Sequence, residues 1–183
     1  MKRNTMELTG ARLKAAENWY KRQVKNGAQP HCVIDSTGCK YLFCEHSAIR
    51  WYGSMLPVEE SIGFTDMEKT LNNIFFLDIE REKESISIET LKCELDSAKS
   101  RVGLSARARF DTQENFYAER LITWENEFRT YALDMEKLYD LLKIMGGKTF
   151  KLYLPRESWN APAFIKGTTN SMDVILMPVR INK

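Results

Sequence analysis

The sequence predicts an α+β fold in which antiparallel sheets carry helices on one face. Single amphipathic helices alternate with runs of short strand-like segments, the pattern expected of this class. The 183 residues, of which 43% are hydrophobic, are enough to bury one core with an appendage, or two small cores. The 28% charged residues and the mean hydropathy of -0.42 are typical of a soluble globular protein.

The first helix is predicted over residues 9–25, because apolar residues recur there at helical spacing and the other positions are rich in Lys and Arg. Gly27 is expected to end it, since glycine suits the left-handed conformation just past a helix. A hairpin is predicted next, from Cys32–Asp35 and Cys39–Cys44. Residues 49–63 contain aromatic residues, a proline and two glycines, so we expect a boundary between regions 1–62 and 63–183.

The second region begins with a predicted helix from Thr65 to about Phe76, because Thr65 and Glu68 form a capping box. Strands are then predicted over residues 85–95, 102–110, 117–124 and 128–133. In the second of these runs, Arg107 and Arg109 alternate with apolar residues, as in a half-buried strand.

A further helix is predicted over residues 134–145, with Asp134 as its N-cap and Gly146-Gly147 at its end. Three strands, over residues 149–154, 163–166 and 173–180, complete the expected fold.

Several classes of function are not expected. No segment approaches the roughly 18 apolar residues of a spanning helix, and the N-terminal residues lack a signal-peptide core, so we expect no membrane segment and a cytoplasmic protein. The sequence has no phosphate loop, nucleophile elbow or paired metal carboxylates, so an enzyme is not expected. The net charge of +2 neither requires nor excludes a polyanionic partner.

Both histidines and three of the four cysteines fall within residues 31–46. Cys32, Cys39, Cys44 and His46 could in principle offer the four ligands of a zinc ion. The usual two-residue spacing between paired cysteines is absent, and cysteine is commonly buried for packing alone. We therefore expect no metal and no other cofactor.

Four ordered segments near the C-terminus resemble a known family. They are Ala118–Trp124 (A-E-R-L-I-T-W), Asp134–Leu142 (D-M-E-K-L-Y-D-L-L), Ala161–Lys166 (A-P-A-F-I-K) and Val174–Ile181 (V-I-L-M-P-V-R-I). Together they resemble the C-terminal domain of the bacterial DNA polymerase sliding clamp, the β subunit, whose last strand reads roughly V-V-M-P-M-R-L. The resemblance implies a DNA-clamp-like domain over residues 63–183, with two helices on one sheet face. Residues 1–62 could then be part of another clamp-type domain.

The resemblance also implies a pocket that captures short peptides of replication proteins. Its residues here would be Lys137, Pro162, Met177, Pro178, Val179 and Arg180. Methionine suits such a surface because its flexible side chain adapts to varied apolar partners. The alternative is that residues 177–180 are simply an apolar edge strand that contains a proline.

In the family, basic side chains on the helices touch DNA phosphates without reading bases. The candidates here are Arg12, Lys14, Lys21, Arg22, Lys25, Lys69 and Lys143. The alternative is a solvated helix face, whose positive charge Glu17, Glu68 and Glu136 dilute.

The resemblance therefore implies a clamp-like processivity factor that binds double-stranded DNA and, through short peptide motifs, DNA polymerase or other replication proteins. Self-association into a homo-oligomer would complete the ring. Two alternatives stay open: a monomeric peptide-binding adaptor or clamp decoy that does not encircle DNA, and an unrelated α+β domain, zinc-stabilised or not.

Overall fold

The computed structural model describes residues 10–34, 38–44, 46–51, 80–108, 120–125, 130–156, 161–166 and 172–179, without the side chains of Val33 and residues 101–108. In these ranges it has helices α1 (Gly10–Lys25), α3 (Ile88–Ala108) and α5 (Met135–Met145). The predicted helix that begins at Thr65 lies outside them.

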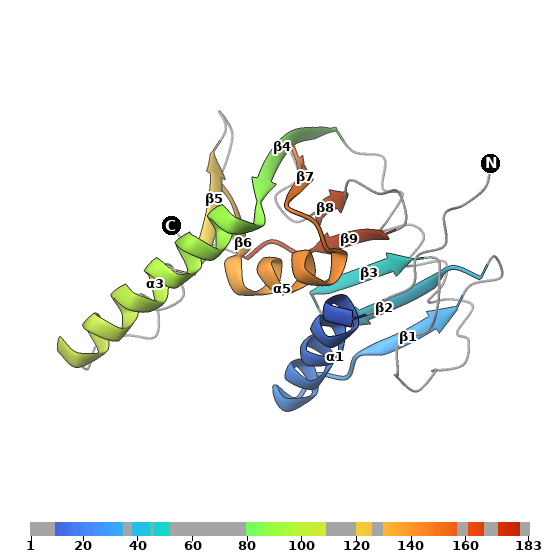
Figure 1. Cartoon of the computed structure of the whole chain (residues 1–183). Helices are drawn as coiled ribbons and strands as arrows, with labels where there is room; N and C mark the ends of the chain where they lie inside the picture. The colour runs from blue at the N-terminus through green and yellow to red at the C-terminus, as the bar shows by residue number, and fades with distance from the viewer. Residues whose placement is uncertain are drawn as a thin grey trace.

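Seven strands form one antiparallel sheet in the order β1-β2-β3-β9-β8-β7-β4 (Figure 1). Their bounds are β1 His31–Ile34, β2 Lys40–Cys44, β3 Ser47–Trp51, β4 Arg81–Ser87, β7 Thr149–Pro155, β8 Ala163–Lys166 and β9 Met172–Leu176. Strands β5 (Leu121–Glu125) and β6 (Thr130–Asp134) form a separate antiparallel pair. The predicted α+β class with antiparallel sheets is confirmed.

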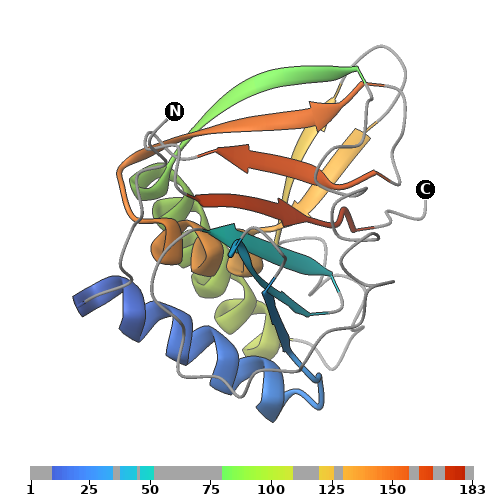
Figure 2. The same cartoon turned by 90° about the vertical axis from the view of Figure 1, so that its right-hand side faces the viewer.

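The large sheet is built from two units of similar connectivity. Helix α1 is followed by β1, β2 and β3, and helix α5 by β7, β8 and β9. The last strands of the two units pair, from Ser47 opposite Leu176 to Trp51 opposite Met172. In each unit the first strand therefore lies farthest from this pairing and the last strand lies at it. Figure 2 shows α1 and α5 on the same side of this sheet. The sheet contains strands of both predicted regions, and the boundary at residue 62 stays a prediction because it lies outside the described residues.

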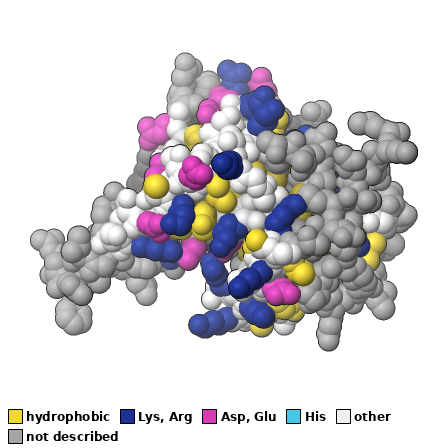
Figure 3. Space-filling model, viewed as in Figure 1, with side chains coloured by type: hydrophobic (Ala, Val, Ile, Leu, Met, Phe, Trp, Pro, Cys, Tyr) yellow, Lys and Arg dark blue, Asp and Glu magenta, His cyan; other side chains and the backbone are white. Residues whose placement is uncertain are grey.

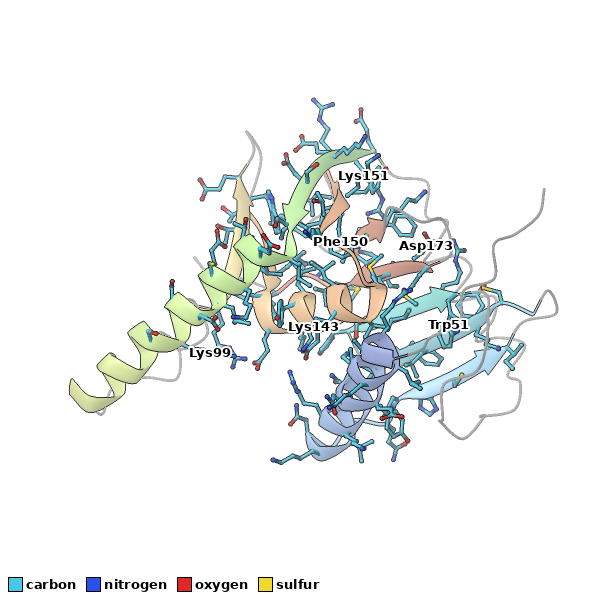
Figure 4. The ribbon with its side chains drawn as sticks, in the orientation of Figure 1. Trp51, Lys99, Lys143, Phe150, Lys151 and Asp173 are labelled. Atoms are coloured by element: carbon cyan, nitrogen blue, oxygen red, sulfur yellow. The ribbon has the colours of Figure 1, made fainter. Side chains whose placement is uncertain are left out.

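The core lies between the sheet and the helices. Alternate residues of the central strands point to this side, among them Trp51 of β3 and Phe150 of β7, which are at most 1% exposed (Figure 4). They pack in one cluster with Trp19 of α1 and Leu138 of α5. Each such buried side chain stabilises the fold by about 1.5–3 kcal/mol, so packing fixes both helices to this face.

The predictions of strands over residues 85–95 and 102–110 are wrong. Strand β4 ends at Ser87, and the following residues up to Ala108 form α3. The reason is visible in Leu91, Leu95 and Ala98, which recur at helical spacing and are buried in the main cluster. The hydroxyl of Ser87 accepts a hydrogen bond from the Glu89 N–H (3.2 Å), so a polar side chain also begins the helix.

The predicted helices over 9–25 and 134–145 and the hairpin of β1 and β2 are confirmed. Strand β3 is not among the predicted strands, because residues 49–51 of it fall in the predicted boundary segment. The predicted last strand is too long, since β9 ends at Leu176 and residues 177–179 continue without strand structure.

Candidate functional site

Helix α1 concentrates positive charge. It carries five basic residues against one acidic residue, Glu17, in a chain with 27 basic and 25 acidic residues. Ala16 and Trp19 are buried, so the helix has one apolar side against the core. Four of the five predicted DNA-binding residues of α1 are exposed: Lys14, Lys21, Arg22 and Lys25. Figure 3 shows Lys and Arg side chains spread over this helix face, with acidic side chains between them.

Arg12, the fifth candidate on α1, is turned into the protein. It is half-buried, and its Nε donates a hydrogen bond of 2.9 Å to the Ile144 carbonyl in the last turn of α5. Gly146, with φ +68°, makes room for it, since a Cβ there would lie 2.9 Å from Arg12 Cδ. Burial lowers the pKa of Arg12. The cation satisfies a carbonyl at a helix C-terminus, where the helix dipole favours positive charge.

Arg22 forms ion pairs with two acidic residues of α5. Its guanidinium pairs with Asp140, and with Glu136 at 3.7 Å. Glu136 also pairs with Arg120 next to β5 and lies 4.0 Å from Lys99 of α3. The acidic side of α5 therefore joins α1, α3 and β5, and it offsets part of the positive charge of the face.

Lys143 of α5 is exposed, with its Nζ 5.4 Å from the centroid of the Tyr139 ring. Figure 4 shows Lys143 on α5 and Lys99 on the neighbouring α3. With Lys14, Lys21 and Lys25, Lys143 makes up the basic helix face, the name used below for these four exposed lysines. Flexible lysines on packed helices can contact phosphates without contacting base edges. The remaining candidate, Lys69, lies outside the described residues.

The predicted peptide-pocket residues gather partly at one end of the central strands. Ala163 of β8 pairs with Leu176 of β9, so Pro162 and Met177 are the next residues on neighbouring strands. The Met177 N–H donates to the His46 carbonyl (2.7 Å), and the Val179 N–H donates to the Ala132 carbonyl of β6 (2.9 Å). Met177, Pro178 and Val179 are half-buried. With Pro162 they form what is called here the apolar corner.

Two residues that the sequence did not single out hold this corner in place. Arg81 of β4 donates to the carbonyls of Pro162 (2.7 Å) and Tyr153 (3.1 Å). The Tyr131 hydroxyl of β6 donates to the Ala161 carbonyl (2.8 Å), and burial raises the pKa of this phenol. Only tertiary contacts give these residues their role, although the alternating charges of residues 80–84 signal a two-faced strand around Arg81.

The other two predicted pocket residues are Lys137 and Arg180, for which no contact with the apolar corner is described. Lys137 lies in the first turn of α5, directly after β6, and is half-buried. Its N–H donates to Asp134 Oδ1 (3.0 Å), so its backbone belongs to the helix cap. Arg180 lies outside the described residues.

The cysteines of residues 31–46 do not converge. Cys32 and Cys44 are buried in the main core, whereas Cys39 is buried with Tyr41 in a second cluster on the other face of the sheet. Among the described residues no three His, Cys, Asp or Glu side chains are placed to hold a metal ion. No helix in the described ranges is long and apolar enough to cross a membrane.

No family model matches the sequence, and no curated protein matches it. Among solved structures, the chain is similar to the DNA polymerase sliding clamp of Caulobacter crescentus, with 9% identity, TM-score 0.42, and coverage of 78% of this chain and 41% of that chain. A second C. crescentus β clamp structure, with PEG bound, gives 10% identity, TM-score 0.43, and coverage of 93% and 63%. The Helicobacter pylori β clamp bound to a DNA ligase peptide gives 11% identity, TM-score 0.39, and coverage of 79% and 41%. The chain thus spans less than two thirds of the length of these clamps.

Proposed function

We propose that this chain is a sliding-clamp-like processivity module of DNA replication, which binds duplex DNA non-specifically through the basic helix face and partner peptides through the apolar corner. The observation that carries the proposal is the pairing of two helix-plus-three-strand units, which sets α1 and α5 on one side of a continuous sheet. The ordered resemblance of residues 118–181 to the last domain of clamps supports it.

The basic helix face suits a protein that must hold DNA and still move along it. Its lysines end in flexible ammonium groups, so their contacts with phosphates are independent of sequence and easily exchanged. The sheet behind the helices gives them a rigid support, because seven strands are joined by backbone hydrogen bonds. Such a surface would bind weakly at physiological salt, so a closed ring would be needed to keep it on DNA.

The apolar corner suits short peptides with apolar side chains. Met177, Pro178 and Val179 are each partly accessible. The Met177 N–H donates to His46 in the turn before β3, and the Val179 N–H donates to Ala132 of β6. A fixed backbone with accessible apolar side chains limits the entropy lost when a peptide binds.

A ring would need several copies. Among the described strands, β1 and β4 lie at the two ends of the sheet, and an end strand is where the sheet of another copy could pair. Pairing of β1 of one copy with β4 of the next would continue the sheet, and a closed symmetric assembly would leave no open edge.

The test is retention on circular DNA. Purified protein is loaded on a nicked circular plasmid and on the same plasmid after linearisation, and both are passed through a sizing column at raised salt. The proposal expects protein to co-elute with the circle and to be lost from the linear form, because an encircling protein slides off free ends.

Equal loss from both forms would contradict encirclement. Binding of a polymerase-tail peptide by a monomer in that case would favour the adaptor instead. Met177→Lys should then abolish peptide binding and Met177→Leu should retain it, because only the first places a charge in the apolar corner.

A further inference from the structure

The face of the sheet that points away from the helices carries a group of basic and aromatic side chains. In β7, Phe150 and Leu152 are buried in the main core. The alternate residues point to the other face, where Lys151 is exposed and Tyr153 is half-buried. Lys83 of β4 pairs with Tyr153, and Tyr153 pairs with Phe164 of β8.

Two register positions away, on the same face, Lys151 pairs with Lys166. Five side chains of three adjacent strands thus share one face: Lys83, Lys151, Tyr153, Phe164 and Lys166. They are called the outer-sheet patch below.

The charges of β4 are sorted between its two faces. Residues 80–84 read Glu-Arg-Glu-Lys-Glu, and side chains of a strand alternate, so the glutamates share one face and Lys83 lies on the other. Lys83, Lys151 and Lys166 are all exposed. Asp173, next to Lys166 in the register, is the nearest acidic neighbour in β9, and its carboxylate pairs with Arg50 of β3. The outer-sheet patch is therefore positive.

The two aromatic rings lie close together within this positive field. The ring centroids of Tyr153 and Phe164 are 6.2 Å apart, and the rings are tilted by 59°. The Lys166 ammonium lies 5.7 Å from the Tyr153 centroid and 5.1 Å from the Phe164 centroid. Both rings are half-buried, and Phe164 also packs against the buried cluster around Ile175. Each ring therefore combines a partly exposed aromatic surface with a neighbouring positive charge.

We propose that the outer-sheet patch binds single-stranded nucleic acid, with unpaired bases stacked on Tyr153 and Phe164 and phosphates held by the three lysines. Aromatic rings and lysines on one surface are the combination that single strands use, since every base has a π-face and every linkage a phosphate. Duplex DNA could use only the lysines, because its bases are stacked on one another. Acidic peptides could likewise use only the lysines.

This surface is separate from the basic helix face. Figure 4 shows Lys151 on β7, away from Lys99 and Lys143 on the helices. The inference therefore goes beyond the proposed clamp function and does not depend on it: one surface would hold a duplex and the other an unpaired strand.

The first test measures the anisotropy of a labelled oligothymidine of about 16 nucleotides, long enough for the site sizes usual on such surfaces. Binding is titrated at several salt concentrations with the full chain and with the triple variant Lys83→Gln, Lys151→Gln, Lys166→Gln. The slope of log K against log salt should fall in magnitude by about 2, since each phosphate contact on a single strand contributes about 0.7.

The matched controls are Glu84→Gln, on the opposite face of the same strand, and Lys92→Gln, an exposed lysine of α3. Both should leave the slope unchanged. No binding of oligothymidine by the unmodified chain, or equal slopes for the unmodified chain and the triple variant, would overturn the proposal.

The second test separates stacking from charge. Tyr153→Leu with Phe164→Leu keeps apolar side chains at both half-buried positions, and circular dichroism and urea unfolding check that the variant folds. Oligothymidine should bind about a hundredfold more weakly, because two base stacks are lost and each weakens binding by roughly tenfold. Binding of a duplex of equal length should be unchanged.

Two results would overturn the assignment to single strands. One is an equal loss of duplex binding in the leucine variant. The other is full competition by polyglutamate at the same concentration of charges, together with unchanged oligothymidine binding in the leucine variant, which would mean that charge alone is recognised. A leucine variant that does not fold would leave the lysine variants to decide, because their side chains are exposed.

Discussion

Asp134 begins helix α5 by accepting two hydrogen bonds at Oδ1, from the N–H groups of Glu136 (2.9 Å) and Lys137 (3.0 Å). These N–H groups have no partner within the helix, so an uncapped helix would leave them unsatisfied. We expect Asp134→Ala to lower the free energy of unfolding by about 1 kcal/mol, measured by urea denaturation. Asp134→Asn keeps an acceptor oxygen and should lose much less; an equal loss in both variants would contradict the cap as the cause.

Asp140 is a second residue, and its environment predicts the direction in which its contribution to stability changes with pH. Burial raises the pKa of its carboxyl above 3.8, against the opposing effect of Arg22, Lys143 and Lys99. The folded state therefore binds a proton more readily than the unfolded state, and this group's contribution to stability falls as the pH rises from about 4 through the raised pKa. The ion pair with Arg22 does not fully offset the burial of Asp140.

We accordingly expect the stability of Asp140→Asn relative to the unmodified chain to rise between about pH 4 and pH 7, because Asn cannot ionise. Urea denaturation over this range measures it. Asp96→Asn is the control with the opposite sign: Lys92 lowers the pKa of Asp96, so the unmodified chain should gain stability relative to this variant as the pH rises from below about 4, where this control is measured. The same trend in both variants would contradict the role of burial at Asp140.

At the scale of elements, helix α1 combines two roles on different sides. Trp19 and Arg12 fix it to the core and to α5, whereas Lys14, Lys21 and Lys25 are exposed. A change at an anchoring residue should alter stability, and a change at an exposed lysine should alter only binding.

We expect Lys14→Gln, Lys21→Gln and Lys25→Gln together to reduce the salt slope of duplex binding by about 3, since each phosphate contact contributes about 0.9 on a duplex. Anisotropy of a labelled duplex measures the slope, and the urea midpoint should stay near that of the unmodified chain. Lys92→Gln on α3 serves as the control. An unchanged slope in the triple variant would mean that α1 is simply a solvated helix face.

Helix α3 illustrates where local patterns mislead. Residues 102–110 alternate polar and apolar side chains, which predicted a strand, yet Leu91, Leu95 and Ala98 pack against the core as one side of a helix. Packing of the first turns extends the helix through residues of weaker preference, because each further residue adds a hydrogen bond to a helix already begun.

At the scale of the whole molecule, the two edges of the sheet decide whether copies can join. Ile34 is an apolar side chain of β1, the last described strand on one side of the sheet, and it is 38% exposed. If β1 pairs with β4 of another copy, light scattering after size exclusion should show a mass that rises with protein concentration to a fixed multiple of 21.3 kDa.

Ile34→Lys should reduce that mass to the monomer, because a charged side chain on an edge strand opposes pairing with another copy, and Ile34→Val should not. A monomer at every concentration in the unmodified chain would rule out the ring and would leave the adaptor.

The sequence by itself determined the features that depend on neighbouring residues. Helical spacing and end signals predicted α1 and α5, and Asp134 was identified as a cap because a cap needs only the residues that follow it. The hairpin of β1 and β2 follows from two apolar runs close in sequence. The α+β class follows from the alternation of such elements.

Only the tertiary structure decided which surfaces these elements form. The pairing of β3 with β9 joins Arg50 to Asp173, 123 residues later, and the pairing of β4 with β7 and β8 brings Lys83, Tyr153 and Phe164 to one face. It also turned Arg12, predicted to face DNA, toward the end of α5. Such placements depend on the burial of side chains from distant segments in a common core, and no local pattern contains the register in which distant strands meet.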